Sequence, residues 1–455
     1  MKVAIISRSS DAKDAIRQLL LPWKVTFTSL DEADVSIVYG EKPPENTDSI
    51  VIPSNCEGFF GWLKKEELEF EREFGKRICV SATKETILSL VPLTYYRYNG
   101  SFECVSGQPS FIKLGNGRLL LTIDIVKEYW RIVNGILHPK ISTFYRLLTG
   151  LPVPYTVAPM RLRSLLMKRK IEFDSINFND KLPLDALRFL LVNSIEEIAH
   201  EKLVRKMWNG KHYVCAVTHD IDTYRGLKRA KVLKRLELKY DVPSAWYIPV
   251  KHYKLDVGIV RELSNHGEVG AHGTKHDGKL VKLPREKMID RLCEAKQILE
   301  NVIKDSIYGF RSPLLQCNAE FIQALNRAGY IYDSSVPVWE PNNPFTMKPY
   351  GIGTVNLMEM NGVFEVPLTL PQDHQMLYVL GMTPKQTVES WLKLMDAVGN
   401  IGGICTILIH PDYELADSKN LETYEELLNS ITAENRALIT TLVKLIEKRL
   451  EKSAK

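Results

Sequence analysis

The sequence has few cysteines and no long apolar run, and both absences narrow the class of protein. Seven cysteines are scattered over 455 residues without a C-x-x-C pair. An odd number of isolated cysteines fits neither a disulfide framework nor a zinc–thiolate site, and it is typical of a reducing compartment. No apolar stretch approaches the roughly 20 residues that cross a bilayer. We therefore expect a protein without disulfides and without a transmembrane segment.

The charge balance argues against a nucleic-acid-binding protein, and the first residues argue against a secreted one. The formal net charge of +5 is small for this length, whereas a nucleic-acid-binding surface usually shows a strong basic excess. Residues 1–7 turn polar too soon for a secretory signal and have the pattern of a first buried strand. We expect a cytoplasmic protein that binds no nucleic acid, with a peripheral position at the membrane as an alternative. The sequence leaves the oligomeric state open.

The hydrophobic pattern divides the chain into four segments. Residues 1–155 alternate strand-like and helical runs, which predicts a small α/β layer domain. Residues 156–205 are helical and basic and are expected to be a connector. Residues 206–415 are also α/β, and seven short strands alternating with helices predict a TIM-like (β/α) parallel barrel. Residues 416–455 predict a C-terminal helical segment, either one amphipathic helix or a pair over 424–452.

The expected strands are short apolar runs with turn-forming residues between them. In the first segment they are 3–6, 35–39, 49–52 and 119–123, with a helix over 11–21. In the barrel they are 214–217, 244–249, 268–271, 307–310, 330–332, 364–368 and 404–409.

Acidic and imidazole side chains follow two of the barrel strands. Asp220 and Asp222 end the first strand, and the D-x-D spacing puts both carboxylates on one side of an extended segment. His272 and His276 follow the third strand with the H-x-x-x-H spacing of many metal sites. Each pattern alone is weak, because aspartate often begins a loop and short motifs occur by chance. Together they are what a divalent metal and a general base require.

Three further residues end other barrel strands. Arg311 follows the fourth strand, where its guanidinium could hold a carboxylate with two hydrogen bonds. Asp333 follows the fifth strand and His410 the seventh, and His410 has the pKa range of an acid–base group. Taken singly, each has an ordinary structural interpretation: Arg311 as a surface arginine, Asp333 as a loop cap and His410 as a buried histidine. Their joint position is more informative, because parallel barrels build active sites at the carboxyl ends of their strands.

This set resembles the polysaccharide deacetylase family, also called the NodB homology domain or carbohydrate esterase family 4. The resemblance covers about residues 211–415 and lies in five motifs that follow the family's order. They are THDID at 218–222, HGTKH at 272–276, RSP at 311–313, DSS at 333–335 and LIHP at 408–411. The resemblance implies a NodB-type barrel and a divalent metal cofactor, with zinc as the first candidate and other divalent ions tolerated.

The resemblance also implies a role for each motif residue. The implied metal ligands are Asp222, His272 and His276. The implied catalytic residues are Asp220 as general base, His410 as general acid, Arg311, which would orient Asp220, and Asp333, which would pair with His410. The implied substrate-binding residues are Pro313, Leu314 and Leu408, of which Leu408 would wall a pocket for the acetyl methyl.

The sequence departs from the family pattern at several positions. Ile221 separates two aspartates that are adjacent in many members. Leu314 stands where an aromatic residue often follows the proline, and Val336 stands near the place of a tryptophan. The last two departures concern the glycan-contacting surface more than the chemistry. His374, after the sixth strand, could contact the substrate, and the basic stretch 225–235 is expected to be a solvated helix face or, alternatively, to attract an anionic substrate.

The sequence therefore predicts a metal-dependent hydrolase that removes an N-acetyl group from an amino sugar of a glycan or glycan precursor and releases acetate. Its expected partner is an acetylated carbohydrate, with anionic or lipid-linked forms as alternatives. Two other functions remain open: a metal-dependent amidohydrolase acting on a small non-sugar amide, and a non-catalytic glycan-binding protein of polysaccharide assembly. Segments of the first domain, such as residues 117–124, weakly resemble class I glutamine-amidotransferase-like layers, which would make that domain a non-catalytic appendage.

Overall fold

The computed structural model describes residues 1–54, 67–72, 76–81, 96–98, 102–104, 111–114, 117–121, 123–143, 146, 181–206, 208–340, 346 and 350–453. The chain forms two compact units, Met1–Val133 with Asn179–Lys206 and Asn134–Phe178 with Met207–Lys455. Each unit has its own large sheet.

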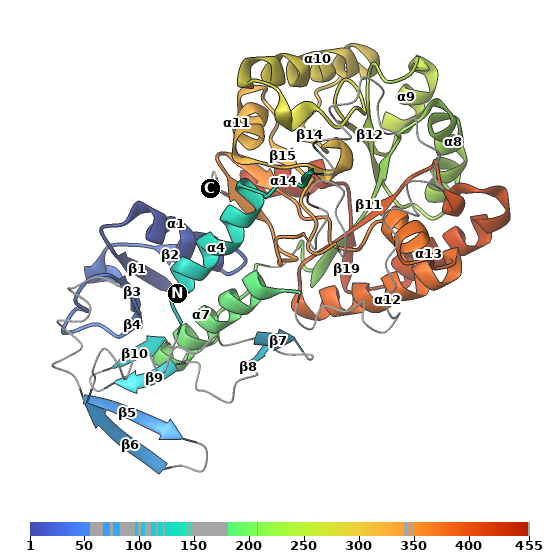
Figure 1. Cartoon of the computed structure of the whole chain (residues 1–455). Helices are drawn as coiled ribbons and strands as arrows, with labels where there is room; N and C mark the ends of the chain where they lie inside the picture. Colours follow the sequence, from blue (N-terminus) through green and yellow to red (C-terminus); the bar gives the residue numbers. More distant parts are fainter. Residues whose placement is uncertain are drawn as a thin grey trace. The chain divides into compact units, whose positions relative to one another are not determined.

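The first unit is an α/β layer around an eight-stranded sheet in the order β2-β1-β3-β4-β10-β9-β5-β6 (Figure 1). The first five strands of this order run parallel, and each of the last three is antiparallel to its neighbour. The central strands are buried and therefore almost wholly apolar. The strands are β1 (Lys2–Ile6), β2 (Thr26–Phe27), β3 (Val35–Tyr39), β4 (Ser49–Ile52), β5 (Glu67–Arg72), β6 (Lys76–Ser81), β9 (Phe111–Leu114) and β10 (Arg118–Leu121), with a separate ribbon of β7 (Tyr96–Tyr98) and β8 (Phe102–Cys104).

Three helices accompany this sheet: α1 (Ser10–Leu20), α4 (Ile125–Leu137) and α7 (Pro183–Ala199). Helix α1 begins after Ser9, whose hydroxyl accepts a hydrogen bond from the Ala12 amide at 3.2 Å. Helix α7 lies in the segment predicted as a connector, and it contacts α1, β3, β4 and β10. The predicted α/β layer is confirmed, whereas its resemblance to amidotransferase-like layers stays a prediction.

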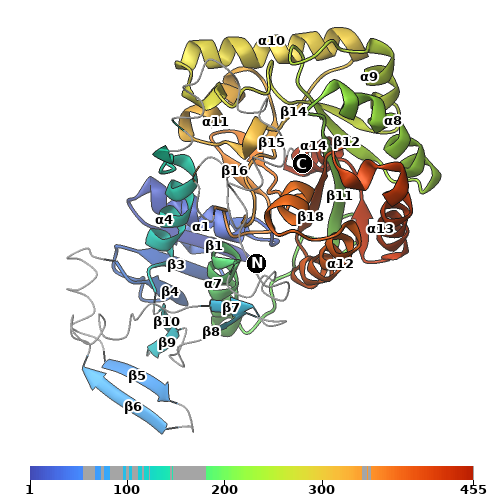
Figure 2. The same cartoon turned by 45° about the vertical axis from the view of Figure 1, so that its right-hand side comes forward.

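The second unit contains a curled sheet of seven parallel strands in the order β17-β15-β14-β13-β12-β11-β18, which confirms the predicted barrel architecture (Figures 1 and 2). The strands are β11 (Tyr213–Asp220), β12 (Ser244–Ile248), β13 (Glu268–Ala271), β14 (Gly309–Phe310), β15 (Tyr332–Asp333), β17 (Val363–Glu365) and β18 (Ile404–Ile409). Strand β16 (Met358–Met360) adds to β17 in the antiparallel sense. Beyond β17, the Leu370 amide donates to the Thr406 carbonyl of β18 at 3.1 Å, which brings the two ends of the sheet together.

Helices alternate with these strands and cover the outside of the sheet. They are α8 (Tyr224–Lys239), α9 (Val257–Ser264), α10 (Arg285–Ile303), α11 (Ala319–Arg327) and α12 (Pro384–Ile401). Helix α12 packs on β11 and β18, as Figure 2 shows. Because each connection returns the chain to the amino edge of the sheet, the carboxyl ends of all seven strands lie together at the opposite edge.

The C-terminal segment differs from the predicted helix or helix pair, because a short strand separates its two helices. Helix α13 (Leu421–Ala433) is followed by β19 (Ala437–Ile439) and then by α14 (Leu442–Ser453). Strand β19 pairs in parallel with the start of β11, where Tyr213 lies opposite Ala437. Leu438, which lies inside the range 424–452 of the expected helix or helix pair, is therefore in a strand. A three-residue strand has too few residues to show a period of its own.

Candidate active site

The candidate residues converge at the carboxyl edge of the curled sheet. Strand β11 ends at Asp220, and Asp222 follows two residues later. His272 follows β13 directly, and Arg311 follows β14, whose Phe310 pairs with Ala271. His410 comes directly after β18, which pairs with β11. Parallel neighbours thus carry these five side chains to one place.

Three of them could hold a metal ion. Nε2 of His276 lies 3.3 Å from Oδ1 of Asp222, and Nε2 of His272 lies 3.6 Å from the same oxygen. One ligand atom from each residue lies within 4.8 Å of the others. These spacings suit ligands that each sit about 2.1 Å from a tetrahedral ion.

The hydrogen bonding and protonation of these ligand atoms also suit a bound cation. Oδ1 of Asp222 is buried, and no described residue gives it a hydrogen bond. Burial lowers the pKa of His276 to about 4 against the opposing effect of Asp222, so its ring is neutral at pH 7. A neutral imidazole is the form that binds a metal. An unpartnered carboxylate oxygen that faces two imidazoles is what a divalent ion would satisfy.

Hydrogen bonds to backbone groups hold the two histidines in place. Nδ1 of His272 lies 2.7 Å from the Arg311 carbonyl, and donating its hydrogen there turns Nε2 toward Asp222. The segment between the two histidines is a loop in which Gly273 has a φ of +78°. The amides of Val250 and Lys251 donate to the carbonyls at 273 and 274, at 3.1 and 2.7 Å. The turn between the two histidines is therefore fixed to the loop after β12.

Asp220 is oriented by a fully buried arginine. Nη1 of Arg311 donates to Oδ1 of Asp220 at 3.2 Å and to the Thr218 hydroxyl at 2.8 Å. Its Nε and Nη2 donate to the carbonyl and hydroxyl oxygens of Ser334, each at 2.8 Å. The guanidinium also lies 4.3 Å above the Tyr247 ring. Oδ2 of Asp220 lies 3.9 Å from Nε2 of His272, so the held carboxylate borders the metal-ligand cluster.

Replacing this arginine is expected to destabilise the protein. Arg311→Met keeps the bulk but leaves Asp220 as a buried charge without its partner, which typically costs about 3–5 kcal/mol. Arg327→Met removes an exposed guanidinium 3.9 Å from Glu286 and should cost less than about 1 kcal/mol. Urea denaturation of both variants measures the difference, and equal losses would contradict the role of Arg311.

The partner of His410 is Asp373 and not Asp333, which corrects the sequence-based assignment. Nδ1 of His410 lies 2.6 Å from Oδ1 of Asp373, and the His410 amide donates to Oδ2 at 2.7 Å. Burial lowers the pKa of His410, but the charge and hydrogen bond of Asp373 outweigh it and raise the pKa to about 10. The ring is therefore protonated at neutral pH, as a general acid requires.

Asp333 has a different environment. Its Oδ1 accepts a hydrogen bond from the Ser335 hydroxyl at 2.6 Å, and that hydroxyl accepts one from the Ser312 amide at 2.8 Å. Burial raises the pKa of Asp333 to about 6, and Glu365, its pair on β17, shares a hydrogen bond with it. Asp333 therefore supports the turn after Arg311. The run Pro371–His374, from which the sequence analysis singled out only the histidine, contained the true partner.

The predicted substrate-binding residues lie on two elements beside these side chains. Pro313 and Leu314 belong to a short turn in which Leu314 has a φ of +63°. Leu408 is fully buried on β18 and forms an apolar cluster with Leu315 and Leu368. Their contact with an acetyl group stays a prediction.

Two residues that the sequence analysis did not assign hold the neighbouring loops. Oδ2 of Asp412 accepts from the Asp222 amide at 3.1 Å, and Oδ1 accepts from the Thr223 hydroxyl, which fixes the backbone of one expected metal ligand. Arg229, from the basic stretch after Asp222, donates to the carbonyls of Pro411 and Asp412 at 3.3 and 3.2 Å. Arg229 therefore holds the loop that follows His410, and the alternative of an anionic substrate stays a prediction.

Fold and site together define a parallel α/β barrel with an aspartate–histidine–histidine cluster at the carboxyl edge of its sheet. The family model described as "Polysaccharide deacetylase" matches residues 229–332. The resemblance seen in the sequence is thus confirmed for the barrel, of which residues 229–332 match the polysaccharide deacetylase family. No curated protein matches the chain significantly.

Several solved structures are similar to about half of this chain. A putative polysaccharide deacetylase from Mycobacterium smegmatis is 18% identical, covers 54% of this chain and 94% of its own, and has a TM-score of 0.45. The Puue allantoinase is 14% identical, with coverages of 52% and 90% and a TM-score of 0.41. A pseudoenzyme of carbohydrate esterase family 4 from Bacillus anthracis is 12% identical, with coverages of 48% and 60% and a TM-score of 0.33.

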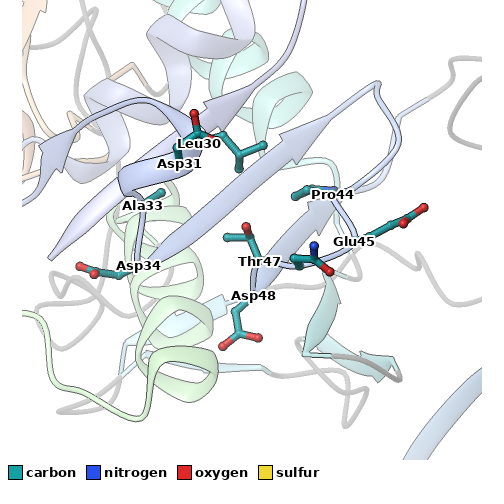
Figure 3. A pocket seen from close by; sticks show the side chains of 9 residues that line it. Leu30, Asp31, Ala33, Asp34, Pro44, Glu45, Thr47 and Asp48 are labelled. Carbon is teal, nitrogen blue, oxygen red and sulfur yellow. The ribbon is translucent and has the colours of Figure 1, made fainter.

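A groove of about 550 Å³ in the first unit contains none of the predicted site residues. It is lined by acidic and small residues around the starts of β3 and β4, including Asp34, Glu45 and Asp48. Figure 3 shows these three carboxylates pointing in different directions, so they do not form a common ligand site. Within the described residues, no helix combines the length and apolar character that a bilayer crossing needs.

Proposed function

We propose that the protein is a metal-dependent hydrolase that removes an N-acetyl group from an amino sugar of a glycan or glycan precursor and releases acetate. The observation that carries this proposal is the cluster of Asp222, His272 and His276 beside the arginine-held Asp220, at the same sheet edge as the protonated His410. A metal site, a base and an acid are the parts that amide hydrolysis needs.

The residues divide the reaction between them. A divalent cation bound by the three ligands, with zinc as the first candidate, would polarise the acetyl carbonyl and lower the pKa of water. Asp220, fixed by Arg311, accepts the proton of the attacking water as its oxygen bonds to the acetyl carbon. The backbone N–H near Leu314 is the proposed donor to the resulting oxyanion.

His410 completes the reaction. The carbon–nitrogen bond breaks as the imidazolium gives its Nε2 proton to the departing nitrogen, which leaves as a free amine. Asp373 binds Nδ1 and therefore leaves Nε2 as the nitrogen that can face the substrate. Without this proton an amine is a poor leaving group, so the raised pKa of His410 serves the step directly.

The proposed substrate is an intracellular or lipid-linked acetylated glycan precursor. The four cysteines whose side chains the structure describes, at 215, 293, 317 and 405, are free thiols, which favours a cytoplasmic location.

A direct test is the purified chain incubated with zinc or cobalt and a panel of N-acetylated sugars, lipid-linked sugars and ureides. We expect acetate release from an N-acetylated sugar, with a loss of roughly 42 mass units per acetyl replaced by hydrogen, as hydrolytic cleavage requires. Ammonia release from a ureide instead would indicate an amidohydrolase on small amides. Glycan binding without any release would indicate a non-catalytic protein.

A further inference from the structure

A cluster of three aromatic rings adjoins His410. The Tyr413 ring lies 4.8 Å from the His410 ring, centroid to centroid. His374 lies 5.7 Å from Tyr413, and Tyr378 lies 5.3 Å from Tyr413 and 5.6 Å from His374. All three of these rings are half-buried, whereas His410 is buried. The cluster is thus continuous with the expected proton donor and open to solvent.

The two loops that carry the cluster are firmly held. His374 precedes and Tyr378 lies within a π-helical turn, Gln375–Val379, a rare conformation that is frequent at functional sites. Side-chain amides of Gln372 and Gln375 donate to buried Glu340 at 2.7 and 3.2 Å. Tyr413 is placed by its amide, which donates to the His410 carbonyl at 3.1 Å. The rings are therefore organised before any ligand arrives, which limits the entropy lost on binding.

The position of the departing nitrogen indicates which part of the substrate should cover these rings. His410 protonates the departing nitrogen, and in the proposed reaction that nitrogen stays on the sugar. The sugar ring must therefore lie on the His410 side, next to Tyr413, while the acetyl group points toward the metal ligands. A pyranose has an apolar C–H face and polar hydroxyl edges, which match the apolar face and polar edge of tyrosine and histidine rings.

We propose that His374, Tyr378 and Tyr413 form the surface on which the amino sugar and its neighbouring sugar ring pack. This inference rests on the proposed function. In the third and fourth motifs this chain has Leu314 and Val336 where aromatic residues that contact the glycan are expected. The proposed surface places this glycan contact on the loops after β17 and β18 instead.

The test compares binding of the N-acetylated glucosamine tetramer to the metal-free full chain by calorimetry. Tyr378→Ala and Tyr413→Ala should each raise the Kd by about 3- to 10-fold, the worth of one aromatic contact. Tyr413→Phe keeps the ring and should bind like the parent protein. Tyr240→Ala is the matched control, because Tyr240 caps the far end of α8 and bonds to Glu425.

Two outcomes overturn the inference and are distinguishable. If the parent protein releases acetate and binds the tetramer but the alanine variants bind it equally well, the aromatic surface is wrong and the proposed function stands. If the parent protein neither binds nor deacetylates any sugar tested, the proposed function fails and the surface fails with it. Thermal unfolding of each variant shows that a weaker Kd does not come from loss of the fold.

Discussion

Asp220→Asn is expected to bind one metal ion per chain while acetate release falls by roughly 10²- to 10⁴-fold, the usual contribution of a general base. Asparagine still accepts the hydrogen bond from Arg311 but cannot take a proton from water. His272→Ala should lose both metal and activity, because it removes one of three ligand atoms. Metal content after dialysis, measured by mass spectrometry, and acetate release from the same samples separate the two variants.

The geometry defines what would contradict this division of roles. Oδ2 of Asp220 lies 3.9 Å from Nε2 of His272, close enough that Asp220 is the nearest competitor for a ligand's role. If Asp220→Asn loses metal as completely as His272→Ala, Asp220 is a ligand and another group must be the base. His266→Ala is the control, since His266 is partly exposed and pairs with Asp241 at 3.1 Å, and it should change neither quantity.

The convergence of the site could be predicted because each side chain comes straight after an apolar strand. Asp220, His272, Arg311 and His410 end or follow four strands of one parallel sheet, and parallel strands deliver their carboxyl ends to the same edge. Sequence order alone therefore brings them together without any knowledge of the loops. The places of the strands also follow from composition, because strands buried on both faces are continuous apolar runs. Their bounds do not, since the run expected over 307–310 is a strand only at Gly309–Phe310.

The pairing of His410 could not be predicted in the same way, because it depends on how the sheet curls. Asp333 ends β15, and its neighbour across the parallel register is Glu365 on β17, not a residue of β18. The chain beyond β17 crosses to β18, where the Leu370 amide bonds to Thr406, and this crossing carries Asp373 to His410. No spacing in the sequence encodes a contact between an irregular loop and the far end of a sheet.

Asp373→Asn is expected to move the basic limb of the pH–rate profile to lower pH. In the folded protein Asp373 raises the pKa of His410 to about 10, so the imidazolium persists through neutral and mildly alkaline pH. Without the carboxylate, burial lowers the pKa of the ring against the smaller opposing effects of Asp222 and Asp220, so the pKa should fall well below 10. If the pKa falls to the usual histidine value of about 6.5, only about 3% of the rings hold the proton at pH 8, and activity at that pH falls by roughly 30-fold.

The contrast with Asp333→Asn decides which carboxylate serves the acid. Asp333 bonds to Ser335 and Glu365 and does not touch His410, so its amide variant should leave the basic limb in place, whatever it does to stability. The measurement is kcat/KM from pH 5 to pH 10, with NMR titration of the His410 ring in the same variants. If the basic limb shifts in Asp333→Asn and stays fixed in Asp373→Asn, Asp333 is the carboxylate that raises the pKa of His410. A shift in Asp373→Asn alone would show that a loop outside the five motifs sets the protonation of the catalytic acid.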